Sequence, residues 1–156
     1  MKRISGLTAQ EKKRRVEAFR KYCSENGIPF TVQRRIVLQE VLNLNTHPTA
    51  DTVYSLPSVR SARISRATVY RTLENLVQAG AITKTCHPGG KVRYDGRTDI
   101  HHHLVCLRCD SIIDITNKAL DALSIPDTSA LDFDVKDFRV QLRGLCRRCR
   151  RMEDKP

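Results

Sequence analysis

Apolar residues in the first half of the chain recur at three- and four-residue intervals, the spacing that predicts amphipathic helices. The stretches between them carry Asn-Gly, Pro, Ser and Thr residues, which end or cap helices. The pattern predicts four helices, over residues 7–25, from Thr31 to Leu42, from Pro48 to Leu56 and from Arg66 to Gln78. Ser65 is the expected cap of the last helix, and Pro57-Ser58 is expected to break the third.

Two short extended runs follow the fourth helix, at residues 81–85 and 91–94. They flank His87-Pro88-Gly89-Gly90, which predicts a β-hairpin. Three helices, then a helix with polar residues at its start, then a basic hairpin form the order of a winged helix-turn-helix. Residues 1–94 are therefore predicted to be a winged-helix domain that begins with a basic helix.

The second half of the chain mixes strand and helix patterns. Phe138, Val140 and Leu142 alternate with polar residues, which predicts a strand with one buried face. The other expected elements are strands at Leu104-Val105 and 112–115 and a short helix at 118–123. The predicted fold class is therefore α+β, with an N-terminal winged helix and a small α/β domain.

The net charge of +11 lies wholly in the first part of the chain. Residues 1–94 carry seventeen Lys and Arg against six Asp and Glu, whereas the later residues carry eleven of each kind. A basic half joined to a neutral half favours a nucleic-acid-binding module attached to a control or assembly module. We place the hinge at residues 95–99 and the second domain at residues 100–156.

Hydropathy also bears on the compartment. No apolar run approaches the roughly 18 residues that a membrane-spanning helix needs, and the N-terminus lacks the apolar core of a signal peptide. The chain is therefore expected in a reducing cytoplasm with no membrane partner.

The helix at residues 66–78 is the candidate recognition helix, because the second helix of a helix-turn-helix motif enters the major groove. Arg side chains suit guanine or phosphate, and Tyr and Thr suit phosphate or the thymine methyl group. The candidate DNA-binding residues are Arg66, Thr68, Tyr70 and Arg71 on this helix, with Lys84 and Lys91 on the hairpin.

Four cysteines form two Cys-x2-Cys pairs, Cys106 with Cys109 and Cys146 with Cys149. Each such turn brings two thiolates to one side of a metal, and the second pair completes a tetrahedral Zn²⁺ shell. The pairs lie beside charged, loop-like residues, which argues against core cysteines or disulfides. A closed four-sulfur site has no open position for a substrate, so this zinc is predicted to be structural.

A second set of possible metal donors lies just before the first cysteine pair. Alternate residues of an extended segment share a face, so two of its three consecutive histidines can bind one ion while His102 points away. Imidazoles with carboxylates suit Fe²⁺ or Mn²⁺, and they also accept Zn²⁺. The candidate ligands are His47, Asp95, His101, His103 and Asp114.

Together these motifs resemble the ferric uptake regulator (Fur) family. The resemblance extends from about Thr31 to Cys149 and rests on the runs HPTAD at 47–51, RATVYRTL at 66–73, HHHLVCLRC at 101–109 and GLCRRC at 144–149. Members are cytoplasmic bacterial metal-dependent transcription factors, usually dimeric repressors with a winged helix and an α/β dimerisation domain. The resemblance implies a homodimer that is no enzyme, with a palindromic double-stranded DNA operator.

The resemblance also assigns roles to the two metal sets. The four cysteines correspond to the family's structural zinc site, and the His and Asp set corresponds to its regulatory site. Iron-sensing members typically carry Glu at the position of Asp114, whereas the peroxide-sensing, PerR-like branch typically carries Asp there and at the position of Asp95. Phe138 stands where some members have the histidine of a further metal site, so that site is not expected.

The PerR-like branch implies a repressor with Fe²⁺ or Mn²⁺ as corepressor. In this reading H₂O₂ oxidises His47 or His101, and the metal and the DNA are released. Metal ions and H₂O₂ are then the only small-molecule partners.

Three other interpretations remain open. An iron- or zinc-sensing member of the same family would differ only in its metal. A zinc-ribbon RNA-binding protein would account for the charge and the cysteines but not for the His and Asp set. A metallohydrolase would use that set, although no separate general base or substrate-binding motif stands out.

Overall fold

The structure is a computed structural model of the chain, and it describes residues 1–44, 46–86 and 90–153. The chain forms two compact units, one of Ser5–Thr98 and one that joins Met1–Ile4 to Asp99–Pro156. The mixture of helices and strands confirms the predicted α+β class. The predicted hairpin turn at His87-Pro88-Gly89 lies outside the described residues. None of the described helices is long and apolar enough to cross a membrane.

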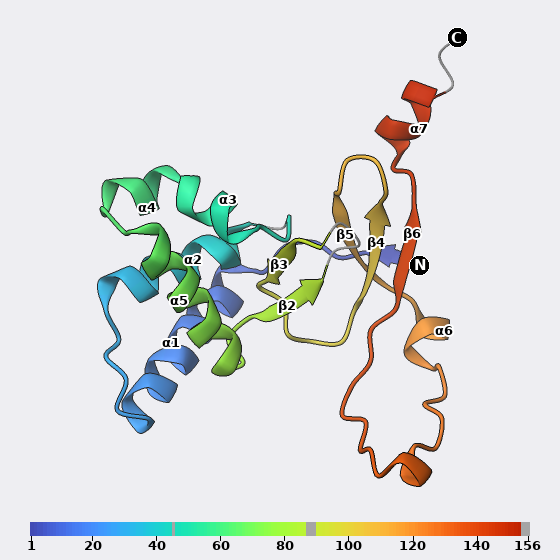
Figure 1. Ribbon diagram of the computed structural model, residues 1–156, viewed down its shortest axis with the longest axis horizontal. Helices are drawn as coiled ribbons and strands as arrows, with labels where there is room; N and C mark the ends of the chain where they lie inside the picture. The colour runs from blue at the N-terminus through green and yellow to red at the C-terminus, as the bar shows by residue number, and fades with distance from the viewer. Residues whose placement is uncertain (45, 87–89, 154–156) are drawn as a thin grey trace. The chain divides into compact units, whose positions relative to one another are not determined.

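Helices followed by a two-stranded hairpin make up the described part of the first unit (Figure 1). Its elements are α1 (Ala9–Glu25), α2 (Val32–Asn43), α3 (Ala50–Ser55), α4 (Pro57–Ser61), α5 (Arg66–Gln78), β2 (Thr83–Cys86) and β3 (Val92–Asp95). Thr8, Thr31, Thr49 and Ser65 cap α1, α2, α3 and α5, each by accepting a hydrogen bond from a backbone N–H of the first turn.

The core of this unit is aliphatic, and α2 contacts α5 within it. Val37 and Leu38 of α2 and Leu73 and Leu76 of α5 are fully buried. Since these apolar residues recur along one side of each helix, packing stabilises both helices at once. The polar side of α5 therefore stays exposed, with its position and rotation set by the buried side.

The third helix ends at Ser55, just before the predicted break at Pro57-Ser58, but Pro57 then begins a further helix, α4, that was not predicted. Pro57 is the first residue of α4, where the fixed φ of proline and its missing N–H are tolerated. The break lies one residue earlier, at Leu56, whose backbone is extended with a ψ of 140°. Val59 of α4 is fully buried and adds to the core.

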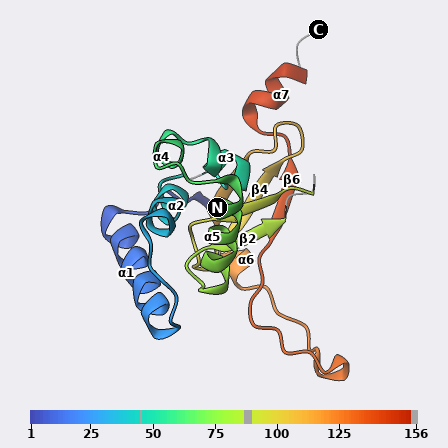
Figure 2. The ribbon, with the colours of Figure 1, turned by 60° about the vertical axis from the view of Figure 1, so that its left-hand side comes forward.

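A four-stranded sheet in the order β1-β5-β4-β6 organises the second unit. Its strands β4 and β6 lie side by side in both views (Figures 1 and 2). β4 pairs antiparallel with β5, whereas β6 returns parallel to β4. The elements are β1 (Lys2–Arg3), β4 (His102–Cys106), β5 (Ile112–Thr116), α6 (Lys118–Asp121), a 3-10 turn (Ser129–Leu131), β6 (Gln141–Gly144) and α7 (Arg147–Glu153).

Two parts of this unit differ from the sequence-based expectation. Lys2 and Arg3, which were assigned to the basic winged-helix domain, pair with Thr116 and Ile115 at the edge of the sheet. The last strand begins only at Gln141, and Leu142 is 41% exposed whereas Phe138 and Val140 are half-buried. Among the described residues, the buried face predicted for this strand is therefore only partly covered. A short extended segment reveals neither its pairing partner nor what lies over it, because both depend on distant residues.

Candidate metal centres and nucleic-acid interface

The four cysteines come together beyond the ends of β4 and β6. Their sulfur atoms lie within 4.8 Å of one another, and Cys109 Sγ is 3.8 Å from Cys146 Sγ. Cys106 is the last residue of β4 and pairs with Gly144 of β6, two residues before Cys146, so the strand register aligns the two Cys pairs. All four thiols are free of disulfides. This donor set fits the tetrahedral shell of a structural Zn²⁺ ion.

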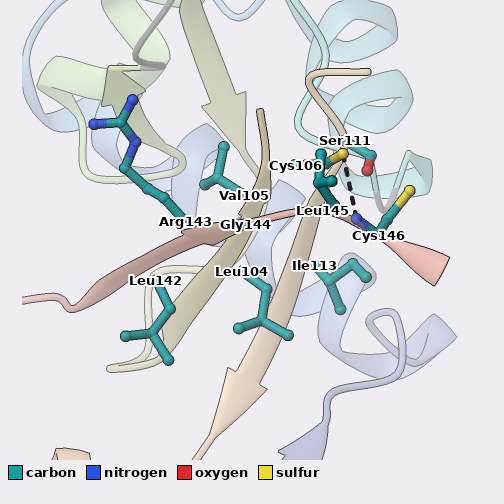
Figure 3. A pocket seen from close by; sticks show the side chains of 10 residues that line it. All are labelled: Leu104, Val105, Cys106, Ser111, Ile113, Leu142, Arg143, Gly144, Leu145 and Cys146. Atoms are coloured by element: carbon teal, nitrogen blue, oxygen red, sulfur yellow. Dashed lines mark hydrogen bonds between the residues drawn. The ribbon is translucent and has the colours of Figure 1, made fainter. Parts of the chain in front are cut away.

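Hydrogen bonds favour the thiolate form of two of these cysteines. The backbone N–H of Cys146 donates to Cys106 Sγ at 3.4 Å and lowers the pKa of Cys106 (Figure 3). The hydrogen bond with Ser111 lowers the pKa of Cys109 to about 6. Burial raises the pKa of Cys149 to about 12. A divalent cation offsets that desolvation, so the cluster fits a metal better than it fits four thiols.

His101, His103 and Asp114 form a second donor group in the same unit. His103 lies opposite Asp114 in the register of β4 and β5, and His101 Nε2 is 3.0 Å from His103 Nε2. Asp114 Oδ1 is 3.6 Å from His103 Nε2 and 3.8 Å from His101 Nε2. Both imidazoles are buried. The backbone oxygen of Asp99 lies 2.8 Å from His101 Nδ1 and orients that ring, which leaves Nε2 directed at the group.

His47 and Asp95 form a third donor pair, in the helical unit. His47 Nε2 is 3.3 Å from Asp95 Oδ2, and both side chains are buried. His47 has a φ of 50°, a left-handed conformation that histidine adopts infrequently. The adjacent Pro48 carbonyl accepts the Tyr94 N–H at 2.9 Å, which ties the loop before α3 to β3. Local strain of this kind is frequent at functional residues.

Gly96 lets the backbone that follows Asp95 pass close to α2. A Cβ atom at this position would lie 3.3 Å from the Val41 carbonyl oxygen and 3.3 Å from Leu42 Cα, both of them backbone atoms. Asp95 Oδ1 also accepts the backbone N–H of Arg97 at 2.7 Å. These contacts hold the Asp95 carboxylate with its other oxygen, Oδ2, directed at His47.

The start of α5 carries the predicted DNA-binding side chains. Arg66, Tyr70 and Arg71 are exposed, but Thr68 is half-buried and its hydroxyl lies 2.9 Å from the hydroxyl of the capping residue Ser65. Asp51 of α3 binds two of the exposed side chains through one oxygen, Oδ1. It accepts from Arg66 Nε at 2.9 Å, from Arg66 Nη2 at 2.6 Å and from the Tyr70 hydroxyl at 3.2 Å. The hydrogen bonds and charge of Asp51 raise the pKa of Arg66.

The two hairpin lysines have different surroundings. Lys84 bonds to Glu74 of α5, and the Tyr94 hydroxyl donates to the same carboxylate at 3.0 Å. Burial raises the pKa of Tyr94, so its hydroxyl remains a donor at neutral pH. Lys91 is exposed and, with Tyr70, lines a pocket of about 400 Å³ between α3, α5 and β3. Glu74 and Tyr94 were not singled out from the sequence, although Glu74 is the one acidic residue of α5.

His102 lies between the two histidines of the donor group in sequence, but its imidazole forms hydrogen bonds with other parts of the second unit. Its Nδ1 accepts the Val140 N–H at 3.0 Å, so its Nε2 carries the proton and donates to Asp121 of α6 at 3.0 Å. The centre of the Phe138 ring lies 6.1 Å from the centre of the imidazole. His102 is fully buried and links β4, α6 and the segment before β6. No sequence pattern indicated Asp121 as its partner.

An apolar hollow lies beside the cysteine cluster. Leu104, Ile113 and Leu142 come from adjacent strands and project to the same side of the sheet (Figure 3). The hollow has a volume of about 160 Å³. Leu142 and Leu145 remain substantially exposed. A contiguous apolar row of this kind is typical of a surface that another protein covers.

Comparison with known proteins identifies the family. The model of the Ferric uptake regulator family matches residues 25–143. The chain is 32% identical to "Peroxide-responsive repressor PerR" of Staphylococcus aureus strain Mu50 over 123 residues, which cover 79% of this chain and 83% of that protein. It is 25% identical to the ferric uptake regulator from Francisella tularensis solved with iron, covering 80% of this chain and 96% of that one with a TM-score of 0.66.

A wider structural match concerns the fold alone. The Helicobacter pylori ferric uptake regulator Fur, described as having three functional metal-binding sites, matches 96% of this chain and 97% of its own with a TM-score of 0.72 at 19% identity. The similarity of fold covers both compact units. The family model and the relatives in sequence confirm the family predicted from the sequence motifs. This chain belongs to the Ferric uptake regulator family.

Proposed function

We propose that this protein is a metal-responsive repressor that binds double-stranded DNA and controls transcription, a regulator and not an enzyme. The observation that carries the proposal is the convergence of His101, His103 and Asp114, in a chain of this family that also has a separate four-sulfur cluster. One donor set is closed and suits a structural ion, whereas the other combines imidazole and carboxylate donors that suit an exchangeable Fe²⁺ or Mn²⁺.

DNA binding is assigned to α5 and the hairpin. The excess of basic residues lies in the part of the chain that contains them, and Arg66, Tyr70 and Arg71 are exposed along one helix. A palindromic operator is read by two copies, whose recognition helices lie one DNA turn apart, about 34–36 Å. The apolar row of Leu104, Ile113 and Leu142 is the surface assigned to pairing of two copies.

The regulatory ion is assigned to all five predicted ligands, His47, Asp95, His101, His103 and Asp114. Each unit contributes an incomplete set, an imidazole with a carboxylate from one and two imidazoles with a carboxylate from the other. An ion that requires both sets favours the orientation of the units in which the DNA-binding helices fit an operator. Metal and DNA then strengthen each other's binding by the same factor.

We further propose that the repressor responds to peroxide. Relatives at about 30% identity are named peroxide-responsive repressors, and Asp114 and Asp95 are the carboxylates that the sequence resemblance associates with that branch. Fe²⁺, when bound, would supply the one-electron redox chemistry that activates H₂O₂, and the oxidised imidazole would be the net source of the electrons that reduce the peroxide. The imidazole of His47 or His101 then gains one oxygen atom from the peroxide, and the other leaves as water. An iron- or zinc-sensing repressor without this reaction is the alternative.

Metal analysis of anaerobically purified protein, paired with DNA binding, tests the proposal. We expect about one tightly held zinc per subunit, together with operator binding that requires added Fe²⁺ or Mn²⁺. Peroxide should release the iron-loaded protein from DNA and leave the manganese-loaded protein bound. Operator binding that is unchanged by removal of the exchangeable metal would exclude a metal-responsive repressor. Operator binding that follows the supply of iron or zinc alone, with no release by peroxide, would place the chain among the metal sensors.

A further inference from the structure

Asp51 is an acidic residue that contacts the start of the candidate DNA-binding helix α5. It lies in the first turn of α3, and its Oδ1 accepts three hydrogen bonds from Arg66 and Tyr70. Arg66 is the first residue of α5 and Tyr70 lies four residues later, so both project from the same side of the helix. A single carboxylate oxygen thus organises the N-terminal part of the candidate recognition helix.

This contact is not needed to hold α3 against α5. The side chains of Arg66 and Asp51 are 61% and 53% exposed, and ion pairs this exposed contribute little to stability. Buried residues of both helices, Val53 of α3 and Val69 of α5, already belong to the common core. A carboxylate also repels DNA phosphates, so its presence at this surface weakens non-specific binding. The pair is therefore better explained by recognition than by folding.

The geometry restricts what the Arg66 guanidinium can do. Asp51 occupies donors on Nε and Nη2, which fixes the plane of the group while Nη1 takes no part in the contact. A guanidinium held in one plane is prepared for a planar acceptor pair such as guanine O6 and N7. The adjacent negative charge also disfavours movement of the same group onto a phosphate, because the carboxylate would approach the DNA backbone with it.

We propose that Asp51 is a specificity-determining positioning residue, which holds Arg66 for contact with a guanine and keeps it off the phosphate backbone. The inference rests on the proposed function, since it assumes that α5 enters the DNA major groove. Tyr70 completes the arrangement by donating to the same oxygen, and it lines the neighbouring pocket between α3, α5 and β3. The sequence read by Arg66 therefore depends on a residue of another helix.

Selection of operators from a randomised DNA library, with Mn²⁺-loaded protein, tests this inference. We expect the wild type to require guanine at a symmetry-related pair of positions. Arg66→Ala and Asp51→Asn should each reduce that preference by about tenfold at the same two positions and leave the others unchanged. Asp51→Asn should also bind non-specific DNA as tightly as the wild type or more tightly, with a steeper salt dependence. A merely structural role would leave the base preference unchanged.

Two further variants keep the test decisive. Arg66→Lys retains the charge but lacks the planar fork, so it should lose the guanine preference while it keeps non-specific affinity. Glu17→Gln removes an exposed acidic group on α1 that pairs with Arg20, and it should leave the base preference intact. Thermal melting identifies any variant that fails to fold, in which case Arg66→Lys carries the test.

The outcomes separate this inference from the proposed function. Retention of the full guanine preference by Asp51→Asn overturns the positioning role. Loss of a preference at positions that Arg66→Ala leaves unchanged also overturns it, because Asp51 would then contact a base itself. Failure of the wild type to select any DNA in the presence of Mn²⁺ would instead refute the proposed DNA-binding function.

Discussion

The Nε2 atoms of His101 and His103 lie 3.0 Å apart, with the two ring planes nearly perpendicular at 87°. His101 and His103 thus direct one nitrogen each to the same point, where Asp114 adds a carboxylate oxygen. Two imidazoles in this arrangement are suited to share one cation, because each can offer its lone pair without rotating its ring.

His103→Ala is expected to abolish the response to Fe²⁺ and Mn²⁺ and to leave the zinc content unchanged. The substitution removes a metal ligand. Because mutation of a residue that only hydrogen-bonds to a ligand already lowers metal affinity by about 10–100-fold, we expect loss of the ligand to lower Mn²⁺ affinity by more than about 100-fold. Calorimetric titration with Mn²⁺ and elemental analysis for zinc measure the two effects. Manganese-dependent operator binding that survives in the variant would show that His103 is not a ligand.

Cys149→Ser should unfold the sheet unit or prevent dimer formation. The binding free energy of a structural zinc ion is part of the folding free energy, so removal of one sulfur weakens both. Zinc content, thermal melting and sedimentation measure the loss. Cys23→Ala is the matched control, because Cys23 is a buried free cysteine that belongs to the core of the other compact unit. A zinc-free Cys149→Ser protein that remains folded and dimeric would contradict a structural role.

Tyr94→Phe should weaken operator binding more than it weakens folding. The Tyr94 hydroxyl donates to Glu74, so the hydrogen bond joins β3, which carries Asp95, to α5. We expect a loss of about 1 kcal/mol in stability and a larger fall in metal-dependent DNA affinity. Tyr54→Phe is the control, because its hydroxyl bonds only to Arg60 among the described contacts and lies on α3. Equal effects of the two substitutions on DNA binding would show that the hydrogen bond between Tyr94 and Glu74 does not contribute to operator binding.

His102→Ala should destabilise the sheet unit by roughly 2–4 kcal/mol, since it removes a buried side chain and leaves the Val140 N–H without its acceptor. Asp121→Ala removes only the exposed partner of the same imidazole and should cost less than half as much. Chemical denaturation of both variants with zinc bound measures the difference. Similar losses would indicate that the bond to Asp121, and not the bond to Val140, holds His102.

Low-dose H₂O₂ is expected to add one oxygen atom to His47 or His101 in the Fe²⁺ form only. The Mn²⁺ form is the matched control, because it should occupy the same ligands and react far less with peroxide. Peptide mass spectrometry locates the added oxygen, and a gel shift follows release from DNA. An Fe²⁺ form that stays on DNA with unmodified histidines would place this protein in the metal-sensing branch.

Several properties of this protein follow from the sequence by itself. The helices of the first unit are visible as apolar repeats with Thr and Ser caps, because helix formation depends on neighbours three and four residues away. The two Cys-x2-Cys pairs indicate a metal cluster for the same reason, since each turn is local. The charge difference between the two halves needs no structure at all.

Only the tertiary structure revealed the relationships between residues that are far apart in the chain. Asp51 holds Arg66, His102 reaches Asp121, and Lys2 pairs with the edge of the sheet. Each of these contacts joins two elements whose relative position is set by the packing of many other side chains. Local periodicity does not say which surfaces meet, so the alternation of Phe138, Val140 and Leu142 predicted one buried face for this strand, whereas Leu142 is exposed in the structure.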